Sequence, residues 1–301
     1  MYQLRIYLLF ALFACISPAL RAQFSPFSTS RIENFHHLEA GGGEQNWYIT
    51  QDHRGVIYAA NNDNGILEFD GSSWRTIPGT EGRSARSLVT GEDGVVYAGM
   101  EGDFGRLEPD RWGNLRFRSL ADSSIWEKYP DMTIWKCWYG NGKVYFCDVE
   151  VIFVLSTDSG DLQQLETSKY AFLTFLIGGK LYTSDFGEGL MVHDGKKLVQ
   201  LPGGAYFSER LVFGIASMDP DHLLIGLFDG ELILYNLTEG RVDSSFIDAG
   251  LREDLISAGG VTNIMIHDDR IFVGTMEGGL YILDRQGKMV EHITQRQGLI
   301  N

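Results

Sequence analysis

Acidic side chains recur at one place in a repeated pattern of this sequence, the short loop between two apolar segments. Ionised carboxylates accept hydrogen bonds and attract positive charge, so a set of them on one surface suits a cation, a basic partner or a polyhydroxylated ligand. The plainer interpretation is that exposed loops of an acidic protein simply favour polar residues. The candidates are Asp63, Glu101, Asp103, Asp148, Glu150, Asp185, Glu188, Asp229 and Glu277.

Tryptophan supplies the second chemical clue. An exposed indole ring beside carboxylates is a common sugar-binding arrangement, because the C–H face of a sugar packs on the ring. Trp126, in a longer loop at 121–132, is the candidate for this role. For Trp47, Trp135 and Trp138 we favour packing between neighbouring repeats, because large aromatic residues dominate protein cores.

Known catalytic and metal-binding patterns are missing from the sequence. It contains no Gly-x-Ser-x-Gly, no His-Glu-x-x-His, no P-loop and no dinucleotide-binding glycine pattern. His36 and His37 are adjacent, and adjacent residues of a strand point to opposite faces, so they make a poor chelate. Two carboxylates could serve a glycosidase as acid and base, but the sequence does not fix their separation. We therefore expect no cofactor, no metal and no enzyme activity.

The loops belong to a repeat that runs along most of the chain. Each unit has an apolar segment, a polar or glycine-containing loop and a second apolar segment, flanked by two further short segments. Equivalent positions are separated by 39, 48, 37, 42 and 48 residues, which is the range of a four-stranded propeller blade at about 40–50 residues. These positions are Tyr58, Tyr97, Tyr145, Tyr182, Leu224 and Phe272.

The pattern predicts an all-β protein. Helical periodicity is missing, β-branched and aromatic residues fill short runs, and 36 Gly against 7 Pro suit many tight turns. We predict a β-propeller with six four-stranded blades, because radial repetition lets each small sheet bury its faces against its neighbours. The expected blades are residues 44–79, 83–120, 131–167, 169–203, 210–247 and 261–295.

The ends of the repeat array predict how the ring closes. Residues 31–37 (RIENFHH) are expected to form an orphan outer strand, and residues 297–301 (QGLIN) look like the lead-in to another blade. We therefore expect an incomplete seven-bladed ring whose remaining strands lie beyond Asn301. The alternative is that six blades close alone.

The N-terminus predicts export. Residues 6–14 (IYLLFALFA) are too short for a membrane-spanning helix of roughly 20 residues, and a small-residue ending follows at Ala22. Residues 1–22 are therefore expected to be a cleaved signal peptide, and the remainder, residues 23–301, a periplasmic sensor domain with no membrane span. An alternative is lipidation at Cys15, because residues 12–15 (LFAC) loosely resemble a lipobox.

Charge and cysteine content narrow the choice of partners. The net charge of −15 becomes −17 without residues 1–22, which contain Arg5 and Arg21 and no acids, and such a charge repels nucleic acid. Cys137 and Cys147 flank a predicted hairpin turn. A disulfide between them stays open, but a shift of one residue in register puts them on opposite faces, so we favour two free, buried thiols.

Part of the sequence resembles a known repeat. Residues 43–49 (GEQNWYI), the hairpin at 51–58 and residues 65–74 look like the start of the two-component regulator propeller repeat. Residues 273–280 (VGTMEGGL) match it as well, whereas Tyr145, Tyr182 and Leu224 stand where the repeat usually has Trp. More narrowly, the chain resembles the N-terminal propeller of triple-tyrosine-motif transcriptional regulators and hybrid two-component sensors of Bacteroidetes.

This resemblance implies a sensory role. In that family the propeller lies outside the inner membrane, and a triple-tyrosine domain, a membrane helix and a cytoplasmic DNA-binding or kinase part follow it. None of these appears before Asn301. We therefore predict a non-catalytic, carbohydrate-responsive sensing module of a membrane-spanning regulator, whose partner is a small molecule, an oligosaccharide or a periplasmic protein. The alternatives are a secreted carbohydrate-active propeller enzyme and a protein-interaction scaffold.

Overall fold

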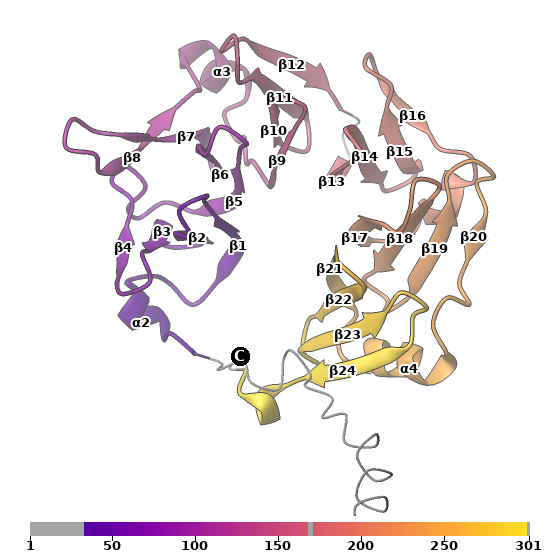
Figure 1. Ribbon diagram of the computed structural model, residues 1–301. Coiled ribbons are helices and arrows are strands. Elements are labelled where there is room, and N and C mark those ends of the chain that lie inside the picture. The colour runs from indigo at the N-terminus through magenta and orange to yellow at the C-terminus, as the bar shows by residue number, and fades with distance from the viewer. Residues whose placement is uncertain (1–32, 168–170, 300–301) are drawn as a thin grey trace, which may run out of the picture. The chain divides into compact units, whose positions relative to one another are not determined.

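The computed structural model describes residues 33–167 and 171–299, and these form six four-stranded antiparallel sheets arranged radially (Figure 1). The predicted all-β propeller with six four-stranded blades is therefore confirmed. By its contacts the chain divides into Met1–Asn34 and Phe35–Asn301, and every element below belongs to the second unit. The predicted signal peptide and Cys15 lie outside the described residues. No helix in the described residues is long and apolar enough to cross a bilayer.

Each blade uses four consecutive strands. Blade one has β1 (Asn46–Gln51), β2 (Ile57–Asn61), β3 (Gly65–Phe69) and β4 (Trp74–Thr76). Blade two has β5 (Ala85–Thr90), β6 (Val96–Met100), β7 (Asp103–Pro109) and β8 (Leu115–Ser119). Blade three has β9 (Lys136–Gly140), β10 (Lys143–Cys147), β11 (Val151–Ser156) and β12 (Leu162–Glu166).

The second half repeats this order. Blade four has β13 (Ala171–Ile177), β14 (Lys180–Asp185), β15 (Gly189–His193) and β16 (Leu198–Gln200). Blade five has β17 (Val212–Ser217), β18 (His222–Leu227), β19 (Leu232–Asn236) and β20 (Val242–Asp243). Blade six has β21 (Val261–His267), β22 (Arg270–Thr275), β23 (Leu280–Asp284) and β24 (Met289–Ile293). The short helices are α2 (His37–Ala40), α3 (Ser123–Lys128), α4 (Ala249–Ser257), η1 (Gly204–Phe207) and η2 (Gln295–Gln297).

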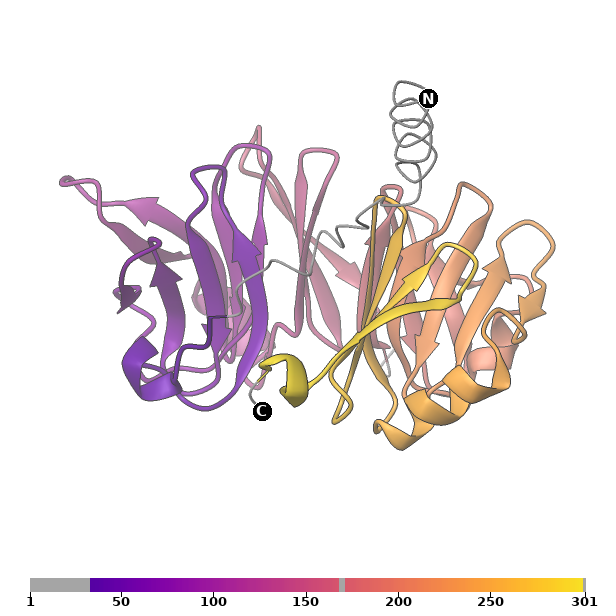
Figure 2. The same ribbon diagram turned by 60° about the horizontal axis from the view of Figure 1, so that its bottom comes forward.

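The strand order gives the propeller two different faces. Because each sheet runs first strand to fourth, the loops between second and third strands lie at the same end as the connections between blades. We call this the connection face; its loops are residues 62–64, 101–102, 148–150, 186–188, 228–231 and 276–279. The helices α2 and α4, which precede first strands, both lie on that side, in different parts of the ring (Figure 2). The other side, where first strands turn into second strands and third into fourth, is the hairpin face.

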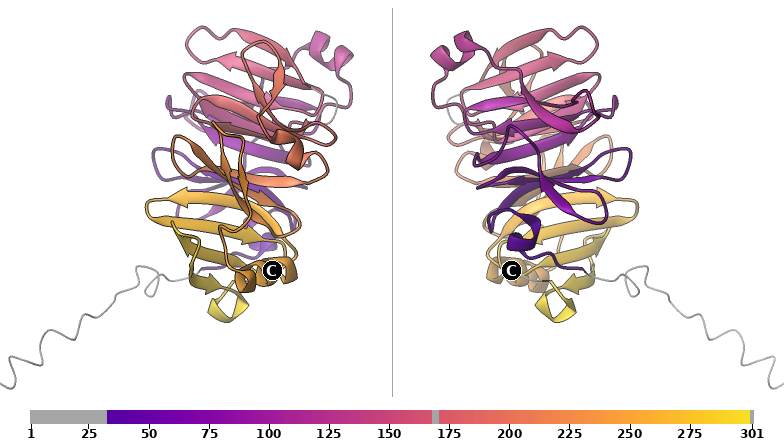
Figure 3. Two further views of the ribbon diagram at one scale, coloured as in Figure 1. Left: turned by 90° about the vertical axis from the view of Figure 1, so that its right-hand side faces the viewer. Right: turned by 90° about the vertical axis from the view of Figure 1, so that its left-hand side faces the viewer.

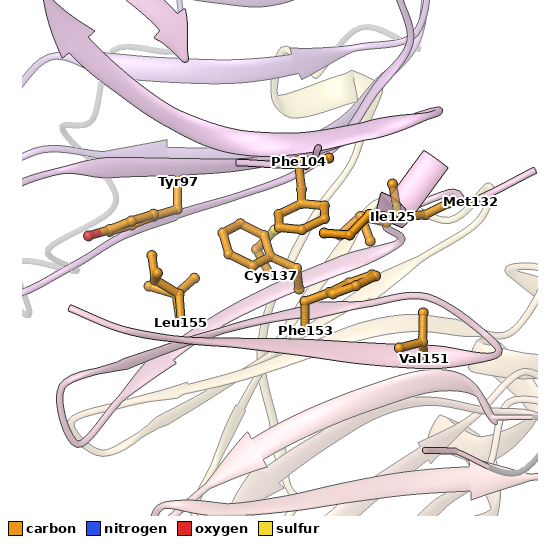
Figure 4. Packing of buried hydrophobic residues seen from close by; sticks show 12 residues of the cluster. Tyr97, Phe104, Ile125, Met132, Cys137, Val151, Phe153 and Leu155 are labelled. Atoms are coloured by element: carbon orange, nitrogen blue, oxygen red, sulfur yellow. The ribbon is translucent and has the colours of Figure 1, made fainter. Parts of the chain in front are cut away.

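The core lies between the sheets. Seen from the side, the twisted blades follow one another roughly face to face (Figure 3). Between blades two and three, the ring of Phe104 stacks on that of Phe153 with centroids 4.6 Å apart, and Tyr97, Cys137 and Leu155 fill the same cluster (Figure 4). Alternate residues of a strand face opposite neighbours, so both faces of an inner blade are buried.

The strand register determines which side of the sheet each cysteine faces. Cys137 pairs with Phe146 across the β9–β10 ladder, so Cys147, the next residue of β10, faces the other side of the sheet. Both thiols are free and buried, as favoured from the sequence. Burial raises the pKa of Cys147 to about 12, and it raises that of Cys137 as well.

The segment before blade one differs from the prediction. Residues 31–32 lie outside the described residues, and residues 33–37 form no strand, so the orphan outer strand is wrong for the part that is described. His36 caps α2 by accepting a hydrogen bond from the Leu38 amide (3.3 Å), and the Phe35 ring packs against Phe69 and Trp74 with centroids 4.9 and 5.7 Å away. The segment thus docks on blade one through aromatic contacts instead of pairing along an edge. The incomplete seven-bladed ring stays a prediction.

Candidate functional site

The first strands carry β-bulges near their starts on the connection face. In five blades the register shifts by one residue there, and the extra residues are Trp47, Arg86, Phe172, Phe213 and Thr262. A bulge interrupts the alternation of side chains and re-aims one of them. In blade three Trp135 takes the corresponding place, directly before β9, where its amide donates to the Cys147 carbonyl (2.9 Å).

Three of these residues meet. The Arg86 guanidinium lies 4.8 Å from the ring centroid of Trp47 and 5.1 Å from that of Trp135. The two indole rings are themselves 6.0 Å apart, edge to face. A guanidinium at such distances is attracted to the electron-rich faces of the rings. Blades one, two and three therefore converge in one aromatic–cationic cluster, which we call the Arg86 cluster.

Polar groups complete the Arg86 cluster. Asn62 Oδ1 accepts hydrogen bonds from Arg86 Nη1 (2.7 Å) and from Trp47 Nε1 (3.1 Å). Glu101 lies 3.6 Å from Arg86, in a weaker ion pair because its side chain is 62% exposed. The Arg86 side chain is only 14% exposed, and its Nε has no hydrogen-bond partner among the described residues. The cluster thus combines a held cation with two indole rings, of which Trp47 is 41% exposed.

Two predicted carboxylates line a hollow beside this cluster. Asp63 and Glu101, both exposed, border a cavity of about 420 Å³ together with Asn62, Arg83 and Ser84. Trp126, on α3, lies next to this region, because its Nε1 donates to the Gly102 carbonyl (3.1 Å), and the side chain is 44% exposed. The structure therefore brings these three predicted residues together near blades one and two.

Three other predicted carboxylates are buried. Asp103 accepts hydrogen bonds from Ser119 Oγ (2.6 Å) and its neighbour's amide, and it pairs with Arg83 (3.1 Å). Asp148 accepts from the amides of Thr133 (2.8 Å) and Glu150 (2.9 Å), and burial raises its pKa. Asp185 is fully buried at the end of β14. Asp103 and Asp148 serve the fold by satisfying loop and side-chain donors.

The remaining four carboxylates are exposed. Glu150 lies in the loop between β10 and β11 of blade three, and Glu188, Asp229 and Glu277 lie in blades four, five and six. Asp229 lies 3.6 Å from Arg210, and the Glu277 amide donates to the Ala258 carbonyl (2.9 Å). These carboxylates share the connection face with the Arg86 cluster but lie in different blades. Of the acidic residues expected on that face, some are therefore exposed and others are buried within the fold.

The tryptophans divide between the two predicted roles. Trp138 packs between blades three and four, where its Nε1 donates to the Thr174 carbonyl (3.0 Å), as the packing alternative predicts. Trp47 and Trp135 pack on each other and on Arg86 while Trp47 stays partly open. Sequence reasoning missed Arg86 and Asn62. Alignment of the repeats could have found Arg86, because it occupies in ARSLVT the place that Trp47 occupies in NWYIT.

The Arg86 cluster offers groups that can bind a ligand. An arginine side chain is charged at all ordinary pH values and only donates hydrogen bonds, so it does not transfer protons. Asn62, Asp63 and Glu101 add acceptors, and the indoles add flat apolar surface. Among the described residues no group of three or more His, Cys, Asp and Glu side chains is placed to hold a metal ion.

Comparison with known proteins adds likeness in fold. No family model and no curated protein matches the sequence. The extracellular domain of the protein described as hybrid two-component system BT3049 of B. thetaiotaomicron is 17% identical, with a TM-score of 0.62 over 87% of this chain and 36% of that chain. That of one-component system BT4673 of the same organism is 15% identical, with a TM-score of 0.58 over 86% and 35%. A streptogramin B lyase is 16% identical, with a TM-score of 0.61 over 87% and 86%.

The two extracellular domains are much longer than this chain, which spans about a third of their length. The chain is similar to them in fold, which confirms at that level the expected resemblance to propellers of two-component regulators. The lyase shows that the same architecture also supports an enzyme. Function therefore has to be argued from the site.

Proposed function

We propose that this chain is an exported sensing module that binds its ligand at the Arg86 cluster on the connection face and does not catalyse a reaction. The observation that carries the proposal is the position of Arg86 between indole rings from the two neighbouring blades. A ligand that contacts Trp47, Arg86 and Trp135 touches three blades at once. Such binding restricts the motion of these blades relative to one another, and a sensor needs a ligand-dependent change of that kind.

The ligand class follows from the groups on offer. Indole faces bind the C–H faces of sugars, and Asn62, Asp63 and Glu101 accept hydrogen bonds from hydroxyl groups. The hollow of about 420 Å³ beside the cluster suits one sugar ring or two. We therefore propose a neutral oligosaccharide as the ligand. The resemblance of the sequence and the likeness in fold to extracellular domains support placing this module in a membrane-spanning regulator.

Thermal unfolding in the presence of neutral oligosaccharides tests the proposal. A ligand at a hundred times its Kd stabilises a folded protein by about 2.7 kcal/mol, which gives a readily measured rise in Tm. We expect Trp47→Ala to abolish this rise. Trp112→Ala is the matched control, because Trp112 is a 71% exposed indole in the turn between β7 and β8 on the hairpin face.

Two results would overturn the proposal. One is a panel of neutral oligosaccharides in which none raises Tm. The other is a ligand whose effect survives in Trp47→Ala and in Arg86→Lys. Both variants keep the buried core between the blades, so each is expected to fold, and far-UV circular dichroism checks this.

A second candidate function is that of a propeller enzyme. It is favoured by the streptogramin B lyase, whose fold matches over most of both chains. The purified chain should then cleave a substrate, and activity should fall when an exposed rim carboxylate is removed, as in Glu101→Ala. We expect no measurable cleavage of glycosides, polyuronates or streptogramin B. Turnover that Glu101→Ala abolishes would establish the enzyme instead.

A further inference from the structure

A tyrosine of the second strand has an internal role in the first two blades. Tyr58 Oη donates to Asp52 Oδ2 (3.0 Å), and Tyr97 Oη donates to Asp93 Oδ2 (2.8 Å). Both aspartates lie in the turn between first and second strands, on the hairpin face. There the Asp52 Oδ1 atom also accepts the Val56 amide (3.1 Å). The Tyr–Asp pair thus closes the turn.

Blades three and four keep the tyrosine but lack the aspartate. Tyr145 and Tyr182 follow the turns Asn141–Gly142 and Gly178–Gly179, which are two-residue turns with positive φ and contain no carboxylate. Neither hydroxyl makes a hydrogen bond to the described residues, and burial raises the pKa of each phenol. The hydroxyls that close turns in blades one and two are therefore available here.

The same two blades also gain a lysine. Lys143 and Lys180 stand two residues before the tyrosines, where blades one and two have Val56 and Val95. Residues two apart on a strand share a face, so each lysine lies on the side of its tyrosine. The Lys-x-Tyr pair is thus duplicated in these neighbouring blades.

A cavity opens where these pairs lie. It has a volume of about 780 Å³ on the hairpin face and extends over the end of blade four from blade three to blade five. On the side of blade three it is lined by Lys143, Tyr145 and Gln163, and the register places Tyr145, Val154 and Gln163 in one row on one face of the sheet. On the side of blade five it is lined by Lys180 and Tyr182.

His193, at the end of β15, adds a buried donor to the cavity wall. Its Nδ1 accepts a hydrogen bond from the Gly195 amide (3.0 Å), so Nδ1 carries no proton and the neutral ring carries its proton on Nε2. Nε2 is shielded from solvent and has no partner among the described residues. A buried hydrogen-bond donor normally has an acceptor, because leaving the donor without one costs about 1–3 kcal/mol of stability. A ligand oxygen can accept from this N–H group when the His193 ring turns toward the cavity, because Nε2 is not itself open to solvent.

The position of the donors, rather than the net charge, indicates the ligand. The two lysines of the lining are balanced by two carboxylates, Asp194 and Asp221, whereas the side of blade three offers the donors Lys143, Tyr145 and Gln163. The Asp194 carboxylate already accepts the amides of Lys196 (2.8 Å) and Lys197 (2.9 Å). We propose that this cavity is a binding site for a small hydroxylated carboxylate, whose anionic group lies against Lys143 and His193 Nε2. The hydroxyl groups of the ligand bond to Tyr145 and Gln163.

Calorimetric titration with glucuronate, using glucose as its neutral match, tests the site. We expect saturable binding of glucuronate, no saturable binding of glucose, and at least about tenfold weaker glucuronate binding in Lys143→Ala and Tyr145→Phe, since each loses a hydrogen bond to a charged or polar ligand group. Lys288→Ala removes an equal charge from the turn between β23 and β24, and Tyr97→Phe removes a hydroxyl that Asp93 already uses. Both controls should bind as the unchanged protein does.

Nuclear magnetic resonance of the histidine side chains gives a second readout that does not depend on a variant. Glucuronate should shift the Nε2–H resonance of His193, and glucose should not. Equal binding of the two sugars, no saturable binding of glucuronate up to about 10 mM, or an unmoved His193 resonance would each overturn the proposal. Trp47 lies on the connection face, so Trp47→Ala should leave glucuronate binding intact. Failure of this site can therefore be distinguished from failure of the Arg86 cluster.

Discussion

Trp47 of blade one and Trp135 of blade three lie edge to face with ring centroids 6.0 Å apart, although a whole blade separates them along the ring. The intervening blade supplies Arg86, which contacts both rings. Neighbouring blades elsewhere meet through the faces of their sheets, whereas this contact reaches past blade two. It therefore ties three blades together on the connection face, and a second contact past blade two places Lys136 Nζ 5.2 Å from the ring centroid of Tyr48.

The first prediction concerns this tie. Arg86→Lys should lower the free energy of unfolding by about 1–2 kcal/mol, because an ammonium group does not lie flat against two indoles while it donates to Asn62. Urea unfolding monitored by tryptophan fluorescence measures it. Arg116→Lys, on the exposed side of β8, should leave the midpoint unchanged. Equal midpoints for both variants would contradict the energetic role of Arg86.

The second prediction compares two tyrosines that are equivalent in the repeat. Tyr97→Phe should cost about 1 kcal/mol of stability, because the Asp93 carboxylate loses a 2.8 Å hydrogen bond. Tyr145→Phe should cost clearly less, because its hydroxyl makes no hydrogen bond within the part of the chain that the structure describes. Chemical denaturation of the two variants side by side checks this, and a larger loss in Tyr145→Phe would show that its hydroxyl is held by the protein.

The third prediction concerns the thiols. Burial raises the pKa of both cysteines, and the thiolate is the reactive form, so Cys137 and Cys147 should resist a disulfide reagent at about pH 8 in the native protein. Both should react rapidly in concentrated urea. A mild oxidant should form no bridge between them in the folded protein, since they face opposite sides of one sheet. Rapid native labelling would show that blade three opens easily.

The fourth prediction is a pH dependence at His193. Burial lowers the pKa of its ring, with partial opposition from Asp194, so the unfolded chain takes up the proton at higher pH than the folded one. Its contribution to stability is complete above the unfolded value of about 6.5 and is lost as the pH falls below that value. The unchanged protein should therefore lose stability relative to His193→Gln between about pH 7.5 and 5 in urea titrations. His267→Gln, at a 74% exposed site, should track the unchanged protein.

The blades could be predicted because the information lies in local sequence. Turns such as those after Gln51 and Thr90 and the alternation of apolar residues recur at blade spacing, and each blade buries its faces in the same manner as the next. The roles of the rim carboxylates could not be read in this way. Asp103 and Asp148 are buried because Ser119 and Thr133 come to them from elsewhere in the chain, and such encounters leave no mark on the loop sequence itself.

Residues 33–37 show a different limit. Their mixture of apolar and polar residues is typical of an edge strand. No local sequence pattern predicts that Phe35 packs on Trp74. The Arg86 cluster likewise depends on one extra residue in each of two first strands, since without the bulges Trp47 and Arg86 would alternate with the core residues of their strands. A shift of one residue is too small to detect in a repeat whose length varies by more than that.

The bulges in the first strands separate the pairing of each strand from the choice of the side chain at its start. The ladder resumes its register after the extra residue, so the pairing of the strand does not depend on the side chain at that place. The chain already carries Trp, Arg, Phe and Thr at these equivalent places, which differ in charge, size and hydrogen-bonding capacity. A point substitution there changes the chemistry of the connection face without changing the strand pairing, although at Arg86 it also removes contacts that join three blades.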